Sequence, residues 1–147
     1  MCATNSLLTP AKLSYDIQGL HHLGLTVSDV ATTAKFFTDH LNFQVVGGKP
    51  DYPAQFITNG HLFLTLWQAQ VSSPVAFDRH KNIGLHHLAL NVGSIGVLDE
   101  LHRLFVELTD VELEFAPEAM GDSPIQHMIC TIPGGLRVEF LAQPSIP

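Results

Sequence analysis

The chain has 147 residues, of which 46% are hydrophobic and 14% charged, enough for one compact core and too little for two large domains. Seven lysines and arginines stand against fourteen aspartates and glutamates, a formal net charge of -7, and the basic residues are scattered along the sequence. Binding to a nucleic-acid backbone requires a basic surface, so the composition argues against nucleic acid as a partner.

Neither export nor membrane insertion is indicated by the sequence. The first ten residues lack a basic segment followed by a long apolar stretch, and no apolar run elsewhere has the length of a bilayer span. The two cysteines, Cys2 and Cys130, are too few for a disulfide framework or a cysteine-based zinc site. We therefore expect a cytoplasmic protein without a membrane partner.

The first predicted element belongs to a segment that occurs twice. Residues 19–27 read Gly-Leu-His-His-Leu-Gly-Leu-Thr-Val, and residues 84–92 read Gly-Leu-His-His-Leu-Ala-Leu-Asn-Val, which indicates an internal repeat. Larger apolar and smaller residues alternate in both copies, as in a strand whose successive side chains point to opposite faces. By this parity His22 and His87 face away from the apolar side. Their neighbours His21 and His86 are expected on the opposite face.

A helix is predicted after each copy of the repeat. Ser28 or Asp29 is a suitable N-cap for the first helix, and Ser94 for the second. Phe36 lies off the apolar stripe of the first helix, and a subunit contact is the only role we assign to it. The stripes are Val30, Ala34, Phe37 and Leu41 in the first helix and Leu98, Leu101, Phe105 and Leu108 in the second.

Three shorter extended runs follow each predicted helix, so that each half reads strand, helix and three strands. Asn59-Gly60 predicts a tight hairpin turn, and Gly134-Gly135 stands at the corresponding place in the second half. The stretch 116–124 contains two prolines and a glycine and is predicted as a loop. The extended runs are Phe43 to Val46, Ala54 to Thr58, Leu62 to Trp67, Val111 to Phe115, Ile125 to Ile132 and Leu136 to Leu141.

Repeat-equivalent histidines and a carboxylate on the last strand predict a metal site. Two repeats that pack about a local two-fold axis would bring His22 and His87 into one concavity. Glu139 stands among apolar residues, where an ionised carboxylate costs free energy unless it is paired or bound to a cation. Two imidazoles and one carboxylate leave coordination positions open, as catalytic sites do. Two alternatives remain: inert hydrogen-bonded histidines, and an ion pair between Glu139 and Arg137.

These segments, taken together and in this order, resemble the vicinal oxygen chelate superfamily. That superfamily includes glyoxalase I, extradiol dioxygenases, fosfomycin-resistance transferases and bleomycin-resistance proteins. The resemblance extends from about Gly19 to Gln143. The motifs that carry it are residues 22–29, Phe36-Phe37 with residues 41–43, residues 87–92 and residues 133–140.

The resemblance implies an α+β fold of two βαβββ modules. The modules are expected to form a cupped, mixed eight-stranded sheet with the helices on its outer face. We expect an N-terminal tail over residues 1–17 and one domain over residues 18–143, with modules over residues 18–75 and 83–143.

The resemblance also implies a site, in which His22, His87 and Glu139 fall on metal-ligand positions. Four-ligand members carry a carboxylate or amide where Thr65 stands, so a three-ligand site is expected. One divalent ion (Zn, Mn, Fe or Ni), a small-molecule substrate and a homodimer are implied. The candidate substrate-binding residues are Arg137, Trp67, His127 and Thr65.

The expected activity is that of a glyoxalase-like lyase or isomerase. The ion would chelate two neighbouring oxygens of a small substrate and stabilise an enolate-like intermediate, with Glu139 as the candidate catalytic carboxylate. The residues do not identify a general base. Two alternatives remain open: an iron(II) dioxygenase that uses the same residues, and a metal-free drug-binding protein.

Overall fold

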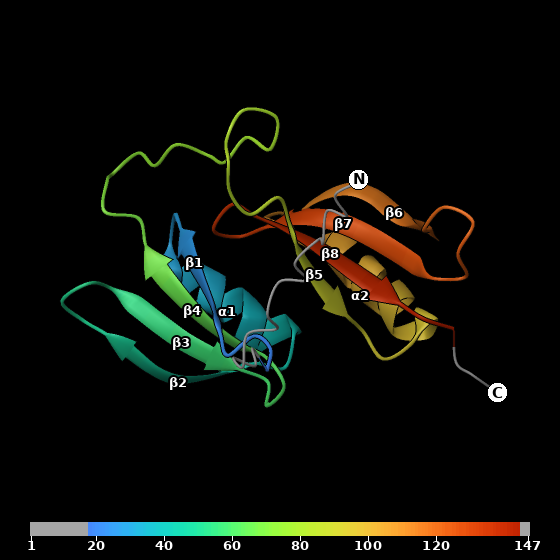
Figure 1. Ribbon diagram of the computed structural model, residues 1–147, viewed down its shortest axis with the longest axis horizontal. Coiled ribbons are helices and arrows are strands. Elements are labelled where there is room, and N and C mark those ends of the chain that lie inside the picture. Colours follow the sequence, from blue (N-terminus) through green and yellow to red (C-terminus); the bar gives the residue numbers. More distant parts are fainter. Residues whose placement is uncertain (1–17, 145–147) are drawn as a thin grey trace, which may run out of the picture.

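The computed structural model describes residues 18–144 and contains two similar halves (Figure 1). The two predicted βαβββ modules are confirmed, while the predicted tail over residues 1–17 lies outside the described residues. The elements are β1 (Leu23–Val27), α1 (Val30–His40), β2 (Gln44–Lys49), β3 (Ala54–Thr58), β4 (Phe63–Gln68), β5 (Leu88–Asn91), α2 (Ile95–Glu107), β6 (Glu112–Ala119), β7 (Gln126–Ile132) and β8 (Leu136–Ala142).

Each module forms a mixed sheet of four strands. The strand order is β1-β4-β3-β2 in the first module and β5-β8-β7-β6 in the second. The first strand runs parallel to the last in each module, and the other pairs are antiparallel. The eight strands thus lie in two sheets of four, and β1 and β5, which begin directly after His22 and His87, are edge strands of their sheets.

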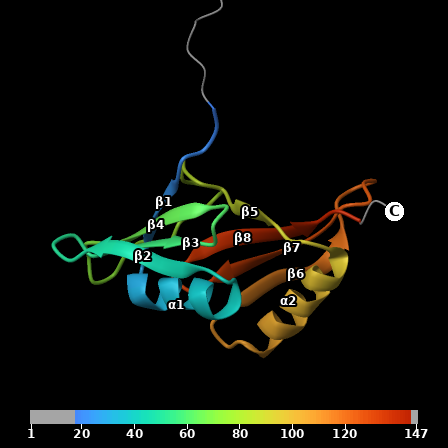
Figure 2. The same cartoon turned by 90° about the horizontal axis from the view of Figure 1, so that it is seen from below.

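Both helices lie on the same side of the two sheets, as Figure 2 shows. Leu64 and Leu66 of β4 point to this side and are fully buried. On β8, Phe140 packs against Phe105 of α2, with ring centroids 5.3 Å apart. Alternate residues of the same strands, such as Thr65 and Glu139, therefore point to the face that no helix covers.

Side-chain caps begin both helices. The Asp29 carboxylate accepts a hydrogen bond of 2.7 Å from the backbone N–H of Thr32, so Asp29 and not Ser28 caps α1. Ser94 caps α2 as predicted, because its hydroxyl accepts from the backbone N–H of Val97 at 3.2 Å. Both helices fall short, within residues 18–144, of the length and apolar character needed to cross a membrane.

Phe36 lies in the core between the two modules, which corrects the subunit contact assigned to it. Its side chain is only 4% exposed, and its ring centroid is 5.6 Å from that of Phe105 in α2. The backbone N–H of Ser28 also donates across the modules to the carbonyl of Gly134, at 3.2 Å. The two helices therefore share one hydrophobic core.

Strand β6 continues into the predicted loop. It pairs with β7 as far as Ala119, but the register shifts between Phe115 and Glu118. The shift skips Pro117, which has no N–H to donate, so the proline is accommodated at a bulge. The hairpin turn predicted at Asn59-Gly60 spans four residues, since the backbone N–H of Asn59 donates to the carbonyl of Leu62. Gly60 within it has φ +88°.

Candidate active site

The structure brings Glu139 together with two histidines on the open face of the second module. Glu139 is 7% exposed. Its Oε2 lies 3.1 Å from Nε2 of His87, and its Oε1 lies 2.6 Å from Nδ1 of His127. Across residues 18–144, no lysine or arginine contacts this carboxylate. Among the described residues, the only charged or titratable partners of this buried acid are therefore imidazoles.

His86 lies beside His87 and not on the opposite face, so the parity prediction for His86 is wrong. β5 begins only at Leu88, and both histidines precede the regular strand in which side chains alternate. The Nδ1 atoms of the two rings are 2.8 Å apart, and Nη1 of Arg137 is 3.4 Å from Nδ1 of His86. Partial desolvation and the nearby Arg137 charge lower the pKa of His86.

His22 stands apart from this cluster. Its Nδ1 is 2.9 Å from Nδ1 of His21, and its ring centroid is 6.4 Å from that of Phe63 on the open face of the first module. Within the described part of the chain, no three histidines, cysteines or acids are placed so that they could hold one metal ion. In one chain, His87 thus contacts Glu139, whereas His22 lies at the start of β1 in the other module.

Trp67 and Thr65 lie on the same open face as His22. The indole Nε1 of Trp67 donates to Oγ1 of Thr65 at 3.0 Å. Rings of Phe56 and Tyr52 lie 6.0 and 5.1 Å from the Trp67 ring, between centroids. The first module therefore presents an aromatic surface, whereas the second presents histidines and a carboxylate.

Arg137 binds Glu114 and not Glu139. Its Nε and Nη2 donate to the two carboxylate oxygens of Glu114 at 2.7 and 2.8 Å, and this contact lowers the pKa of Glu114. Nη1 of Arg79 lies 3.8 Å from the same carboxylate. The alternative in which Arg137 neutralises Glu139 is therefore excluded by these contacts. Neither Glu114 nor Arg79 was singled out from the sequence, since nothing local marks them as partners of Arg137.

Residues 19–140 match the model of the Glyoxalase/Bleomycin resistance protein/Dioxygenase superfamily. The chain belongs to this superfamily. The resemblance inferred from the sequence motifs is thereby confirmed.

Individual relatives of the superfamily are distant in sequence. The uncharacterized protein YwkD of Bacillus subtilis is 26% identical over 104 residues, covering 67% of this chain and 80% of that protein. A glyoxylase/bleomycin resistance protein/dioxygenase domain from Frankia sp. has a TM-score of 0.75 at 19% identity, covering 87% of this chain and 99% of that one.

A fosfomycin resistance protein of known structure has the same fold. A mutant of FosX from Listeria monocytogenes, complexed with Mn(II) and 1S,2S-dihydroxypropylphosphonic acid, has a TM-score of 0.70 at 18% identity, covering 87% of this chain and 94% of that one. At such identities the structural likeness establishes the fold, and the α+β architecture of two modules is confirmed.

Proposed function

We propose that the protein is a metal-dependent, glyoxalase-like lyase or isomerase whose divalent ion is held by His22, His87 and Glu139. The observation that carries this proposal is the contact of 3.1 Å between His87 and Glu139 on an open sheet face. A buried carboxylate without a guanidinium or ammonium partner is costly, and a cation shared with an imidazole offsets that cost. The Mn(II) in the FosX relative supports a divalent ion on this fold.

The hydrogen bonds around His87 fit such a cation. The lowered pKa of His86 favours its neutral ring, whose Nδ1 would accept a hydrogen bond from Nδ1 of His87, 2.8 Å away. In this tautomer His87 Nε2 carries a lone pair, and it faces Oε2 of Glu139, which is also an acceptor. Two acceptors this close favour a bound ion between them. His127 would hold the second carboxylate oxygen in place.

A second copy of the chain is the proposed source of the third ligand. His22 does not lie with His87 and Glu139 in one chain, but it is exposed on an open face at an edge strand. In a two-fold dimer that pairs the first module of one copy with the second module of the other, each site would contain the partner's His22. Such a homodimer would have two equivalent sites.

The bound ion would act as a Lewis acid on two neighbouring oxygens of a small substrate. The residues of the chain supply the surroundings. Trp67 with Phe56 and Tyr52 would contact the apolar part of the substrate, and Thr65 would fix the indole through its hydrogen bond. Arg137 is left out of this site, because Glu114 already binds two of its donor groups.

Metal content of the wild type and of Glu139→Ala tests the proposal. We expect about one ion per chain in the wild type and a loss of most of it in the variant, while Glu112→Ala, an exposed carboxylate of β6, behaves as the wild type. A wild type that binds less than about a tenth of an equivalent, with no gain on adding ions at neutral pH, would contradict the proposal.

Mixing two variants that each lack one proposed metal ligand tests whether the site is shared between two copies. His22→Ala and Glu139→Ala each lack one ligand in every site, whereas a mixed dimer has one complete site and one site without either ligand. We therefore expect the refolded mixture to recover metal binding that neither variant has alone. A mixture as poor in metal as its components would contradict a site across two copies.

A metal-free binding protein is the second candidate, and one observation favours it. Both oxygens of Glu139 already contact imidazole nitrogens, so ring N–H groups of His87 and His127 would satisfy the carboxylate without an ion. The metal-content measurement separates the two candidates. Oxygen-dependent turnover with iron(II) would instead assign a dioxygenase reaction to the same three ligands.

A further inference from the structure

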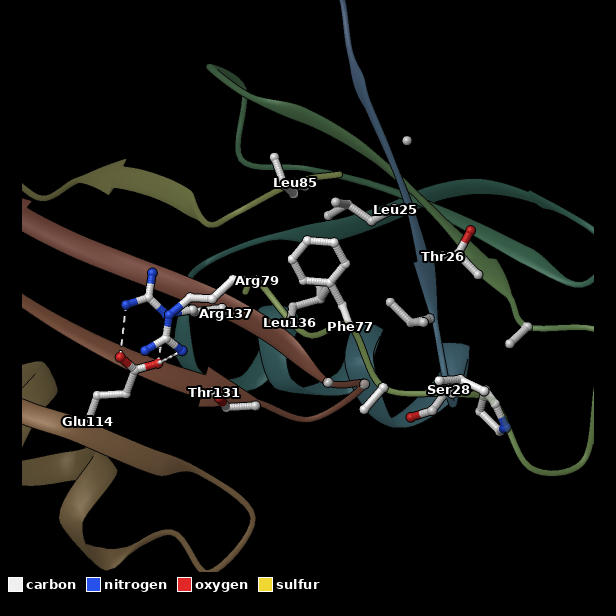
Figure 3. A pocket seen from close by; sticks show the side chains of 18 residues that line it. Leu25, Thr26, Ser28, Phe77, Arg79, Leu85, Glu114, Thr131, Leu136 and Arg137 are labelled. Atoms are coloured by element: carbon white, nitrogen blue, oxygen red, sulfur yellow. Dashed lines mark hydrogen bonds and ion pairs between the residues drawn. The ribbon is translucent and has the colours of Figure 1, made fainter. Parts of the chain in front are cut away.

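A cavity lies between the two modules of one chain (Figure 3). Its volume is about 660 Å³, within the range of small-molecule sites. β1 forms one wall, the turn before β8 and the start of β8 form another, and the segment that links the modules closes it. His22, His87 and Glu139 are not among its lining residues.

One part of this cavity is apolar. Phe77 of the linking segment projects into it between Leu25 of β1 and Leu136 of β8 (Figure 3). The Phe77 ring rests against the backbone of Gly84, where a Cβ would lie 2.7 Å from the ring. A glycine at this place therefore lets the linking segment fold back and carry Phe77 into the cavity.

The other end of the cavity carries two guanidinium groups and one carboxylate. Two donor groups of Arg137 hydrogen-bond to the carboxylate of Glu114. Arg79 lies 3.8 Å from Glu114, beyond hydrogen-bond distance, and its side chain is 37% exposed. Since the contact with Arg137 lowers the pKa of Glu114, the carboxylate stays ionised at neutral pH. The cluster therefore has one positive charge in excess and spare donors on Arg79.

We propose that this intermodule cavity binds a small amphipathic monoanion, with its carboxylate on Arg79 and its apolar body against Phe77. One negative charge on the ligand matches the one excess positive charge of the cluster, and a guanidinium suits a carboxylate because its donors match the two oxygens. The apolar lining matches the rest of the ligand, whose burial favours binding. This inference does not depend on the proposed metal site.

Calorimetric titration of the full chain with octanoate tests the inference. We expect one octanoate per chain and an affinity about tenfold higher than for octanamide, the neutral isostere, because a charged hydrogen bond is lost with the charge. Arg79→Gln should weaken octanoate binding by about tenfold for the same reason. Arg103→Gln, which removes an exposed arginine of α2 outside the cavity, should leave it unchanged.

The inference would be overturned by no binding heat up to about 10 mM octanoate, by equal affinity for octanoate and octanamide, or by wild-type affinity in Arg79→Gln. Circular dichroism and thermal melting would establish that Arg79→Gln is folded. Glu139→Ala should bind octanoate as the wild type does, so this test and that of the metal site can fail separately. Loss of octanoate binding in Glu139→Ala would also overturn the inference, because octanoate binding would then depend on the proposed metal site.

Discussion

Gly134 in the turn between β7 and β8 packs directly against Thr33 in the first turn of α1. A Cβ at Gly134 would overlap the Thr33 hydroxyl oxygen, and that hydroxyl donates to the carbonyl of Asp29 at 2.6 Å. Gly134 also has φ +94°, a conformation that residues with a Cβ rarely adopt. The first module's helix and the second module's last turn are therefore in contact without room for a side chain.

Gly134→Ala is expected to destabilise the protein for two reasons. The positive φ costs about 1 kcal/mol for a residue with a Cβ. Displacing Thr33 adds about 1–3 kcal/mol of overpacking. Urea denaturation measures the sum as a lower free energy of unfolding. Gly60→Ala is the matched control, because Gly60 has φ +88° but nothing within 4 Å of its Cβ position. Equal losses in both variants would contradict the packing argument.

Phe36→Ala is expected to lower the free energy of unfolding by about 3–5 kcal/mol, as for other buried aromatic residues. Phe36 is buried against Phe105 of the other module, so its removal leaves a cavity in the shared core. Val106→Ala, at a position of α2 that is 58% exposed, should change the free energy by about 0.5 kcal/mol or less. Similar effects of the two substitutions would show that the modules do not depend on this contact.

His127→Phe is expected to weaken binding of a divalent ion by about 10–100-fold, because the partner that orients Glu139 is lost. The prediction rests on the proposed metal site and on the 2.6 Å contact between His127 Nδ1 and Glu139 Oε1. Competition with a chelator measures the affinity. His61→Phe, at an exposed hairpin histidine, is the control, and His127→Gln should restore part of the affinity. Unchanged affinity in His127→Phe would remove His127 from the site.

Lowering the pH is expected to destabilise the wild type more than it destabilises the variant Glu114→Gln. The hydrogen bond from Arg137 lowers the pKa of Glu114 below its ordinary value of 4.5. The unfolded chain therefore takes up a proton at Glu114 before the folded chain does, and stability is lost as the pH falls below about 5. Thermal melting between pH 6 and pH 3 should show a shallower loss in Glu114→Gln. Glu112→Gln, at an exposed position of the same strand, should retain the wild-type slope.

Local patterns in the sequence were enough to predict the helices and most of the strands, and the resemblance to the superfamily supplied their arrangement. Period-two alternation located β1 and β5, and apolar stripes with capping residues located α1 and α2, because these signals depend on residues a few positions apart. The repeat then implied two equivalent modules. The same alternation placed His22 away from the apolar side, and its ring lies near Phe63 on the open face.

The partners of the polar side chains were decided only by the tertiary structure. Arg137 stands two residues from Glu139 along β8 but binds Glu114, which the sheet brings near it from β6. His86 joins His87 because both precede the regular strand, where parity no longer applies. The buried position of Phe36 depends on α2, because Phe105 of that helix packs against the Phe36 ring.

What the sequence by itself determined is therefore the set of elements and the faces of their side chains, because hydrophobic periodicity reports which side of an element is buried. The tertiary structure alone decided that His87 and Glu139 meet while His22 stays apart, and that a cavity with Arg79 lies between the modules. Such contacts depend on how the modules pack and on where bulges shift the strands, and residues distant in the chain set both.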